Sequence, residues 1–199
     1  MTHQMDVNVP APSPFPDVKR EFVMIFKISA ASAAITAISF ITGPVLAQGV
    51  KPTDPQIAHI AYTAGVIDIT AAKQAKSKSK NKEVLAFADD MLRDHEAVNK
   101  QALDLVKKLN VTPEDNDTSR SLSKAAADKQ TELAKLNGAA YDKAYIQNEV
   151  AYHKTVNGAL ETTLIPSANN AELKSLLQTG LKIFQGHQQH AEHAAAEIK

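Results

Sequence analysis

The sequence predicts an all-α protein, because three features of residues 48–199 agree. Apolar residues recur there at spacings of three and four, which places them on one face of a helix. Alternating β-branched runs, which are typical of strands, are missing, while Ala, Leu, Lys, Gln and Glu dominate. Every proline of this region falls at an expected helix end, where proline is tolerated: Pro52, Pro55, Pro113 and Pro166.

The first helix is expected to begin with Asp54 as its N-cap and Pro55 in the first helical position. Its inner face carries Asp68 among isoleucines and alanines, whereas His59 lies off that face and is expected to be exposed. The basic last turn, residues 76–82, suits the negative end of the helix dipole. This charge run therefore predicts a solvated helix end rather than a binding patch.

The second helix is expected from about Asn81 to Asn110 and has the most regular apolar stripe of the chain. His95 is the only polar residue in that stripe. The other stripe residues are Val84, Ala88, Met91, Val98, Ala102, Leu105 and Leu109.

A long connection is expected to lead to the third helix. Residues 111–118 are typical of a polar loop, and residues 119–137 of a weakly apolar helix. The third helix then covers about residues 139–164, and its buried stripe includes Glu149 and His153.

The fourth helix is expected to start at Asn169, which forms a capping-box pattern with Glu172, and to place His187 on its inner stripe. Four helices of roughly 25 residues make a bundle about 35–40 Å long. The connection between the second and third helices is long and the other turns are short, which predicts one crossover. The expected fold is therefore a ferritin-like four-helix bundle.

Residues that bind metals well fall near the middle of four different helices: Asp68, His95, His153 and His187. Mid-helix positions meet at the middle of a bundle whichever way each helix runs, so these side chains are expected at one level. Glu149 lies one turn from His153 and is a candidate fifth ligand. Histidine and carboxylate ligands without thiolate suit divalent iron, manganese, zinc or copper.

The same residues have a purely structural interpretation. Asp68 can hold His95, and Tyr145 or Tyr152 can satisfy the other imidazoles, so that a buried hydrogen-bond network fixes the register of the bundle without an ion. Asp94 can orient a ligand or face water. The protein would then be a structural or interaction module of the cell envelope, and both interpretations stay open on sequence alone.

A second group of histidines lies near the end of the fourth helix, where His187 and His190 are followed by His193. Glu192 and Glu197 lie among them, and His193 with Glu197 forms an i, i+4 pair that can chelate a surface ion. The alternative is an ordinary exposed, polar helix end.

Composition excludes several functions. The 22 basic and 22 acidic residues balance, so there is no general attraction to nucleic acid or anionic lipid. The absence of cysteine excludes disulfides, thiolate metal sites and cysteine nucleophiles. Phosphate-binding glycine loops, nucleophile elbows and His-Glu-x-x-His motifs are missing, so no enzyme class is predicted. A metal ion and a second copy of the chain remain as candidate partners.

Residues 1–47 are expected to be an N-terminal extension with a signal peptide, and residues 48–199 a single domain. Lys27 precedes an uncharged apolar run, residues 28–41, and a cleavage pattern ends at Ala47. The predicted location is periplasmic or secreted, without stable membrane insertion after cleavage.

Two alternatives concern this N-terminal segment. Met24 offers a second start that gives a short, normal n-region. Residues 28–46 are nearly long enough to span a bilayer, so an uncleaved anchor is the rival interpretation.

The second expected helix contains a motif made of Phe87, Ala88, Met91, Asp94, His95 and Asn99. This motif resembles that of an exported bacterial family of unknown function, numbered 4142 and placed in the ferritin-like superfamily. Further similarity covers residues 137–146, the later His153, and the fourth-helix pair of His187 with Ala191.

This resemblance covers about residues 55–198 and implies an exported four-helix bundle, but no activity. The family commonly has Glu where Asp68 stands, so that ligand is shorter here by one methylene. The Glu-x-x-His pattern of di-iron bundles is missing, so the resemblance does not support ferroxidase chemistry.

Overall fold

The computed structural model describes residues 51–198, and all regular secondary structure within them is helical. The predicted all-α class is therefore confirmed, while the signal-peptide prediction falls on residues outside this range. The elements are α2 (Asp54–Lys78), α3 (Lys82–Lys108), α4 (Asp117–Ala134), α5 (Gly138–Ala159), the π-helical turn η2 (Leu160–Leu164), α6 (Ile165–Ser167) and α7 (Ala171–Glu197).

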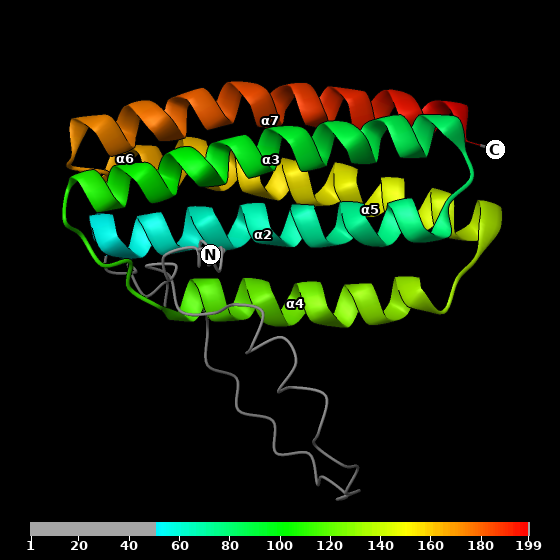
Figure 1. Ribbon diagram of the computed structural model, residues 1–199, viewed down its shortest axis with the longest axis horizontal. Helices are drawn as coiled ribbons and strands as arrows, with labels where there is room; N and C mark the ends of the chain where they lie inside the picture. Colours follow the sequence, from blue (N-terminus) through cyan, green and yellow to red (C-terminus); the bar gives the residue numbers. More distant parts are fainter. Residues whose placement is uncertain (1–50, 199) are drawn as a thin grey trace, which may run out of the picture.

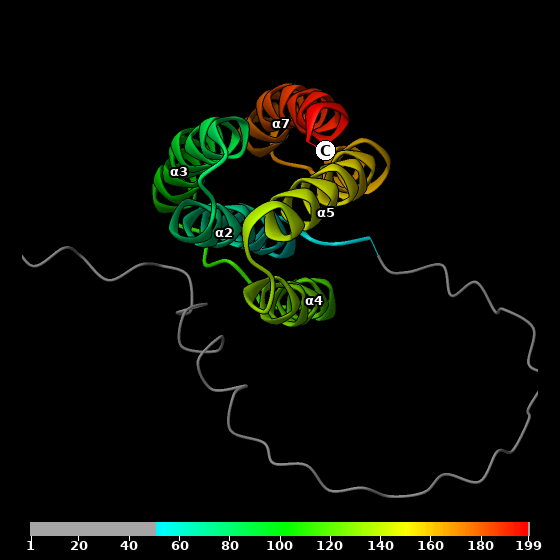
Figure 2. The same cartoon turned by 90° about the vertical axis from the view of Figure 1, so that its right-hand side faces the viewer.

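Four of the long helices, α2, α3, α5 and α7, lie side by side around one interior (Figures 1 and 2). Helix α2 packs on α3, α5 packs on α7, and contacts of α3 with α7 and of α2 with α5 complete the ring. Helices α2 and α7 run in one direction and α3 and α5 in the other (Figure 1). Since α3 and α5 are parallel, the chain between them has to travel back along the whole bundle.

Helix α4 makes this return outside the ring, against α2 and α5 (Figure 2). Its sequence explains the position, because only Ser119, Ala127 and Leu133 of α4 are buried. A helix with so narrow an apolar face can cover other helices but cannot share their core. The expected weakly apolar helix in the long connection is thus present.

Two predicted helix caps are displaced by one residue. Thr53, not Asp54, is the N-cap of α2, and Asn170, not Asn169, is that of α7. The reason is that the Asp54 carboxylate accepts hydrogen bonds from the backbone N–H groups of Asn169 and Asn170, each at 2.8 Å. Asp54 therefore ties the start of α2 to the start of α7.

Two apolar clusters fill the ends of the bundle, and polar side chains lie between them. One cluster contains Ile57, Ile60, Leu160, Leu164, Ala168, Leu173, Leu177 and Phe184. The other includes Ala71, Ala75, Val84, Phe87, Met91, Tyr141, Tyr145, Ile146, Ala191 and Ala194. Between these clusters, each of the four ring helices carries a buried polar residue that the sequence singled out: Asp68, His95, His153 or His187.

The expectation that His59 is exposed is wrong, since only 4% of its surface is accessible. Helix α2 contacts α3, α4 and α5, so it is buried on more than one side. A single inner stripe does not describe the buried surface of a helix that a further helix covers from outside the ring.

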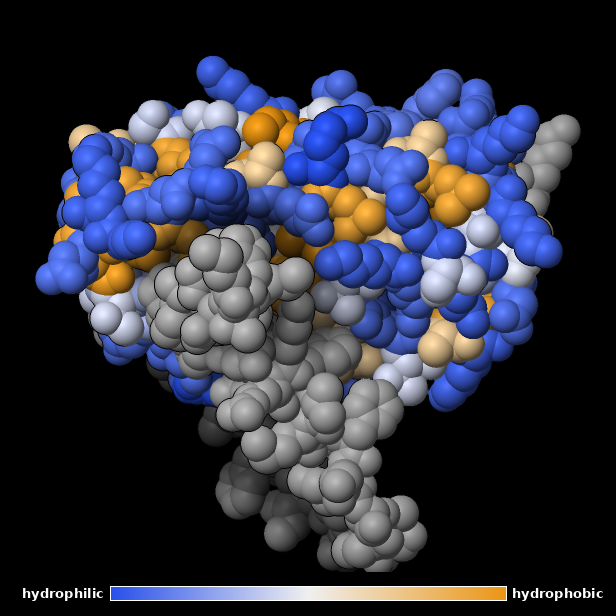
Figure 3. Space-filling view, viewed as in Figure 1, coloured by the Kyte–Doolittle hydropathy of each residue, from blue (hydrophilic) through white to orange (hydrophobic). Residues whose placement is uncertain are grey.

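Hydrophilic residues cover most of the described surface in Figure 3, with scattered apolar patches between them, as is usual for protein surfaces. Among residues 51–198, no helix combines the length and the apolar character that crossing a membrane requires.

Candidate metal centre

Three histidines from three helices meet in the middle of the bundle. His95 of α3, His153 of α5 and His187 of α7 are all buried. Their ring centroids are 5.2–5.9 Å apart. One ring nitrogen of each lies within 4.8 Å of the others, close enough for one ion to gather all three after small side-chain movements.

Two carboxylates extend this histidine group. Asp68 of α2 and Glu149 of α5 form a second set with His153, again with ligand atoms within 4.8 Å of one another. Asp68 Oδ2 lies 3.4 Å from His95 Nε2, and Glu149 Oε2 lies 3.7 Å from His153 Nδ1. Because His153 belongs to both sets, the structure brings all five predicted side chains into one cluster.

Hydrogen bonds at the edge of the cluster select the tautomers of two histidines. His153 Nδ1 lies 3.0 Å from the carbonyl oxygen of Glu149, and His187 Nε2 lies 3.0 Å from Asp94 Oδ2. Both acceptors require an N–H donor, so these nitrogens carry the protons. The lone pairs are therefore on His153 Nε2 and His187 Nδ1. In metal-binding histidines too, a hydrogen bond donated by one ring nitrogen leaves the lone pair of the other nitrogen for the ion.

His95 is positioned by stacking instead. Its ring lies parallel to that of Phe184, with a centroid separation of 4.6 Å and an interplanar angle of 11°. Neither ring nitrogen has a hydrogen-bond partner among the described residues. The 3.4 Å approach of Asp68 is an ion-pair distance rather than an aligned hydrogen bond.

The tyrosines considered as partners for the histidines have other roles. Tyr152 donates to the backbone oxygen of Ala64 at 3.2 Å. The hydroxyl of Tyr145 has no partner within residues 51–198. The hydrogen-bond network that the sequence allowed is therefore incomplete at the histidines.

Burial sets the charge of the cluster. Burial raises the pKa of Glu149 to about 7. Burial also raises the pKa of Asp68 well above its usual range, and the adjacent Glu149 raises it as well. Without a cation, burial therefore favours the protonated form of this carboxyl pair.

The imidazoles are affected in the opposite sense. Burial lowers the pKa of His153 to about 4 and lowers the pKa values of His95 and His187 as well. All three rings are thus neutral at pH 7, which is the form that binds metals.

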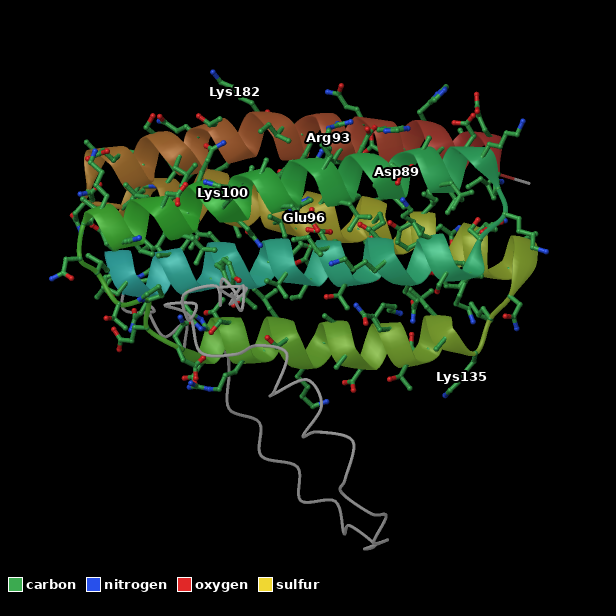
Figure 4. The ribbon with its side chains drawn as sticks, in the orientation of Figure 1. Asp89, Arg93, Glu96, Lys100, Lys135 and Lys182 are labelled. Atoms are coloured by element: carbon green, nitrogen blue, oxygen red, sulfur yellow. The ribbon has the colours of Figure 1, made fainter. Side chains whose placement is uncertain are left out.

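A surface ion pair supports Asp94. Arg93 lies on the outer side of α3 (Figure 4), and its Nε donates to Asp94 Oδ1 at 2.7 Å. The guanidinium also binds Asp90 at 2.7 Å. Arg93 lowers the pKa of Asp94, so this carboxylate stays ionised. It accepts a hydrogen bond from the N–H group of His187. The sequence alone leaves open whether Asp94 orients a ligand or faces water, and the structure pairs it with His187. The roles of Arg93 and Phe184 depend on contacts between side chains that no motif in the sequence signals.

The remaining histidines near the end of α7 lie apart from this centre. His190 Nδ1 pairs with Asp90 at 3.3 Å, and His193 Nε2 pairs with Glu197 at 3.3 Å in an exposed position. Two groups among the described residues can hold a metal ion, and neither includes His190 or His193.

Comparison with known proteins gives one match. The family described as "Domain of unknown function (DUF4142)" matches residues 42–194. No curated protein and no solved structure matches the chain.

Proposed function

The chain belongs to the DUF4142 family, whose description assigns no activity, and we propose from the site itself that the protein binds one divalent transition-metal ion. The ligands are ring nitrogens of His95, His153 and His187, completed by carboxylate oxygens of Asp68 and Glu149. The ion lies at the middle of the bundle, between the two apolar clusters.

One observation carries this proposal: buried ligand atoms without hydrogen-bond partners gather in two neighbouring groups that share His153. They are Asp68 Oδ1, Glu149 Oε2, both nitrogens of His95, His153 Nε2 and His187 Nδ1, judged within residues 51–198. An unsatisfied buried polar atom typically costs about 1–3 kcal/mol, and such atoms are rare in native proteins. A cation satisfies several of them at once, whereas the structural-module alternative leaves the ring nitrogens of the three histidines unpaired.

The ligand set also limits the choice of ion. Imidazole and carboxylate suit iron, manganese, zinc and copper(II), and the chain has no cysteine for softer thiolate sites. A bound cation favours the ionised form of Asp68 and Glu149, and two carboxylates with three neutral imidazoles then balance a divalent charge.

We propose a role in metal handling or stress protection on a ferritin-like scaffold. The parallel pair α3 and α5, joined across the bundle by residues 109–137, supports that arrangement. Glu149 and His153 are four residues apart rather than three, so the site differs from the Glu-x-x-His di-iron pattern. Binding of the ion, rather than ferroxidase chemistry, is therefore the proposed activity.

Elemental analysis of untagged protein purified without chelators tests the metal site. We expect about one transition-metal ion per chain. Restoring the ion to chelator-treated protein at about 100 times its Kd should raise the melting temperature by about 5–10 °C. Protein that is metal-free as purified, with a melting temperature unchanged by iron, manganese, zinc and copper, would contradict the proposal.

We further propose that the protein acts outside the cytoplasm, in the periplasm or after secretion. The support is the charged start, apolar run and cleavage pattern in residues 24–47. N-terminal sequencing of the protein from its own cells is expected to begin at Gln48. A chain that retains residues 28–46 would instead support the membrane-anchor alternative.

A further inference from the structure

The five candidate ligands form two overlapping groups rather than one. The histidine group consists of His95, His153 and His187, and the carboxylate group of Asp68, Glu149 and His153. Bonds from such ions to nitrogen and oxygen are about 2.0–2.2 Å long, so two ligands of one ion lie at most about 4.4 Å apart. The ligand atoms of each group lie within 4.8 Å of one another, whereas no group of this kind among the described residues spans all five. The two groups therefore define two neighbouring positions for an ion, which share His153.

The histidine position is prepared for an ion by hydrogen bonds and stacking. Hydrogen bonds from the opposite ring nitrogens fix the rings of His153 and His187, and they leave His153 Nε2 and His187 Nδ1 without a partner within residues 51–198. His95 is held by stacking on Phe184, and neither of its ring nitrogens has a hydrogen-bond partner in this range. Three neutral imidazoles form a ligand set that is typical of zinc and also suits copper(II).

The carboxylate position is richer in oxygen. It combines one imidazole, that of His153, with Asp68 of α2 and Glu149 of α5. Asp68 Oδ1 and Glu149 Oε2 are buried and have no hydrogen-bond partner in the part of the chain that the structure describes, so both oxygens are available to a cation. Carboxylate oxygens suit manganese(II), whereas imidazole nitrogens suit zinc and copper. The two positions therefore differ in the ion that they favour.

Charge balance allows only one divalent ion in the two positions. Asp68 and Glu149 supply two negative charges, and the imidazoles bind as neutral donors. Because Asp68 Oδ2 lies 3.4 Å from His95 Nε2, these charges also adjoin the histidine position. The carboxylate of Asp94 is already paired with Arg93. A second divalent ion would leave uncompensated positive charge in the interior of the bundle, which is strongly unfavourable.

We propose that the centre holds one ion at a time in one of these two positions, and that the chemistry of the ion selects the position. Zinc and copper(II) occupy the histidine position, and manganese(II) occupies the carboxylate position. The inference rests on the proposed metal site and specifies where in it each ion lies. His95 and His187 then determine the affinity for zinc, Asp68 and Glu149 determine that for manganese(II), and His153 contributes to both.

Titrations of the chelator-treated full chain with zinc and with manganese(II) test this inference. Zinc binds more tightly than manganese(II) to most sites, so each affinity is compared with that of the wild type for the same ion. His95→Leu removes a ligand of the histidine position alone and is expected to weaken zinc binding about 100-fold, with little change for manganese(II). Glu149→Gln removes a ligand of the carboxylate position alone and is expected to weaken manganese(II) binding to a similar extent.

Two further effects are controlled in the same titrations. Glu149→Gln also removes a balancing charge, so zinc binding is expected to weaken in this variant, but less than manganese(II) binding does. His193→Leu and Glu96→Gln change exposed residues of the same two types and should leave both affinities unchanged. Circular dichroism of every variant checks that the bundle is folded.

Pulsed electron paramagnetic resonance of the wild type locates the ions without any substitution. Copper(II) is expected to show nitrogen couplings from several imidazoles, and manganese(II) from the imidazole of His153 alone. The same couplings for both ions, or equal losses of zinc and manganese(II) affinity in both ligand variants, would overturn the two positions and leave the metal site standing. Two ions bound per chain would overturn the single occupancy. If none of these ions binds to the wild type, the metal site and its two positions fail together.

Discussion

His187 Nε2 lies 3.0 Å from Asp94 Oδ2 and is hydrogen-bonded to this carboxylate. His187 Nδ1, which has no partner among the described residues, is left for the metal ion. The carboxylate is in turn held by Arg93 on the surface of α3. Asp94 is therefore a positioning residue for the metal centre, although it does not touch the proposed ion.

Replacing Asp94 is expected to weaken metal binding while all five ligands remain. Asp94→Ala removes the acceptor that selects the tautomer of His187 and should lower metal affinity about 10–100-fold, measured by competition with a chelator. Asp94→Asn keeps an oxygen that can accept the same hydrogen bond and should restore much of the affinity. Asp104→Ala, an exposed aspartate on the same helix, is the control. Equal affinities of Asp94→Ala and the control would refute the positioning role.

The stability of the metal-free protein is expected to depend on pH through Glu149. Its pKa in the folded protein, about 7, exceeds the ordinary value of 4.5, so its stabilising contribution is complete below pH 4.5 and is lost as pH rises towards 7. Relative to the wild type, Glu149→Gln should gain up to about 1.4 kcal/mol of unfolding free energy per pH unit in this window. Urea unfolding of chelator-treated protein measures the difference, and parallel pH profiles would contradict it.

Substitution of His95 distinguishes the metal-binding interpretation of the cluster from the structural one. In metal-free protein, His95→Leu removes two unpaired buried nitrogens and retains an apolar contact with Phe184, so stability should be unchanged or higher. The same variant should lose the rise in melting temperature that the metal gives to the wild type. Marked destabilisation of the metal-free variant would instead show that His95 belongs to a structural hydrogen-bond network.

Gly65 permits the close approach of α2 and α3. A Cβ atom at this position would lie 2.3 Å from Oδ1 of the buried Asn99. Gly65→Ala is therefore expected to destabilise the protein by about 1–3 kcal/mol in urea unfolding. Gly158→Ala is the control, because nothing lies within 4 Å of its added Cβ and the helix gains up to about 1 kcal/mol. Equal effects of the two substitutions would disprove the steric explanation.

The placement of the site could be predicted because helices rise uniformly along their axes. Counting from helix starts put Asp68, His95, His153 and His187 at one level, and errors of a residue in the caps of α2 and α7 did not move that level. Whether an ion occupies that level stays a prediction, because sequence spacing carries no information about occupancy.

The rotation and neighbours of each helix could not be predicted in the same way. The burial of His59 depends on how α2 is turned against its neighbours, and the pairing of Asp94 with His187 rather than His95 depends on how α3 faces α7. These relationships arise between segments far apart in the chain. A periodic pattern within one helix cannot encode them.

No helix supplies more than two of the five proposed ligands, and the ligands extend from Asp68 in α2 to His187 in α7. No fragment that lacks α2, α3, α5 or α7 can therefore assemble the full set. Retention of the ion is therefore coupled to cooperative folding of the whole bundle. The bound ion slows global unfolding. A proteolytic cut that frees a terminal helix releases the ion. A bound ion is therefore a marker of chains whose four ring helices are intact and assembled.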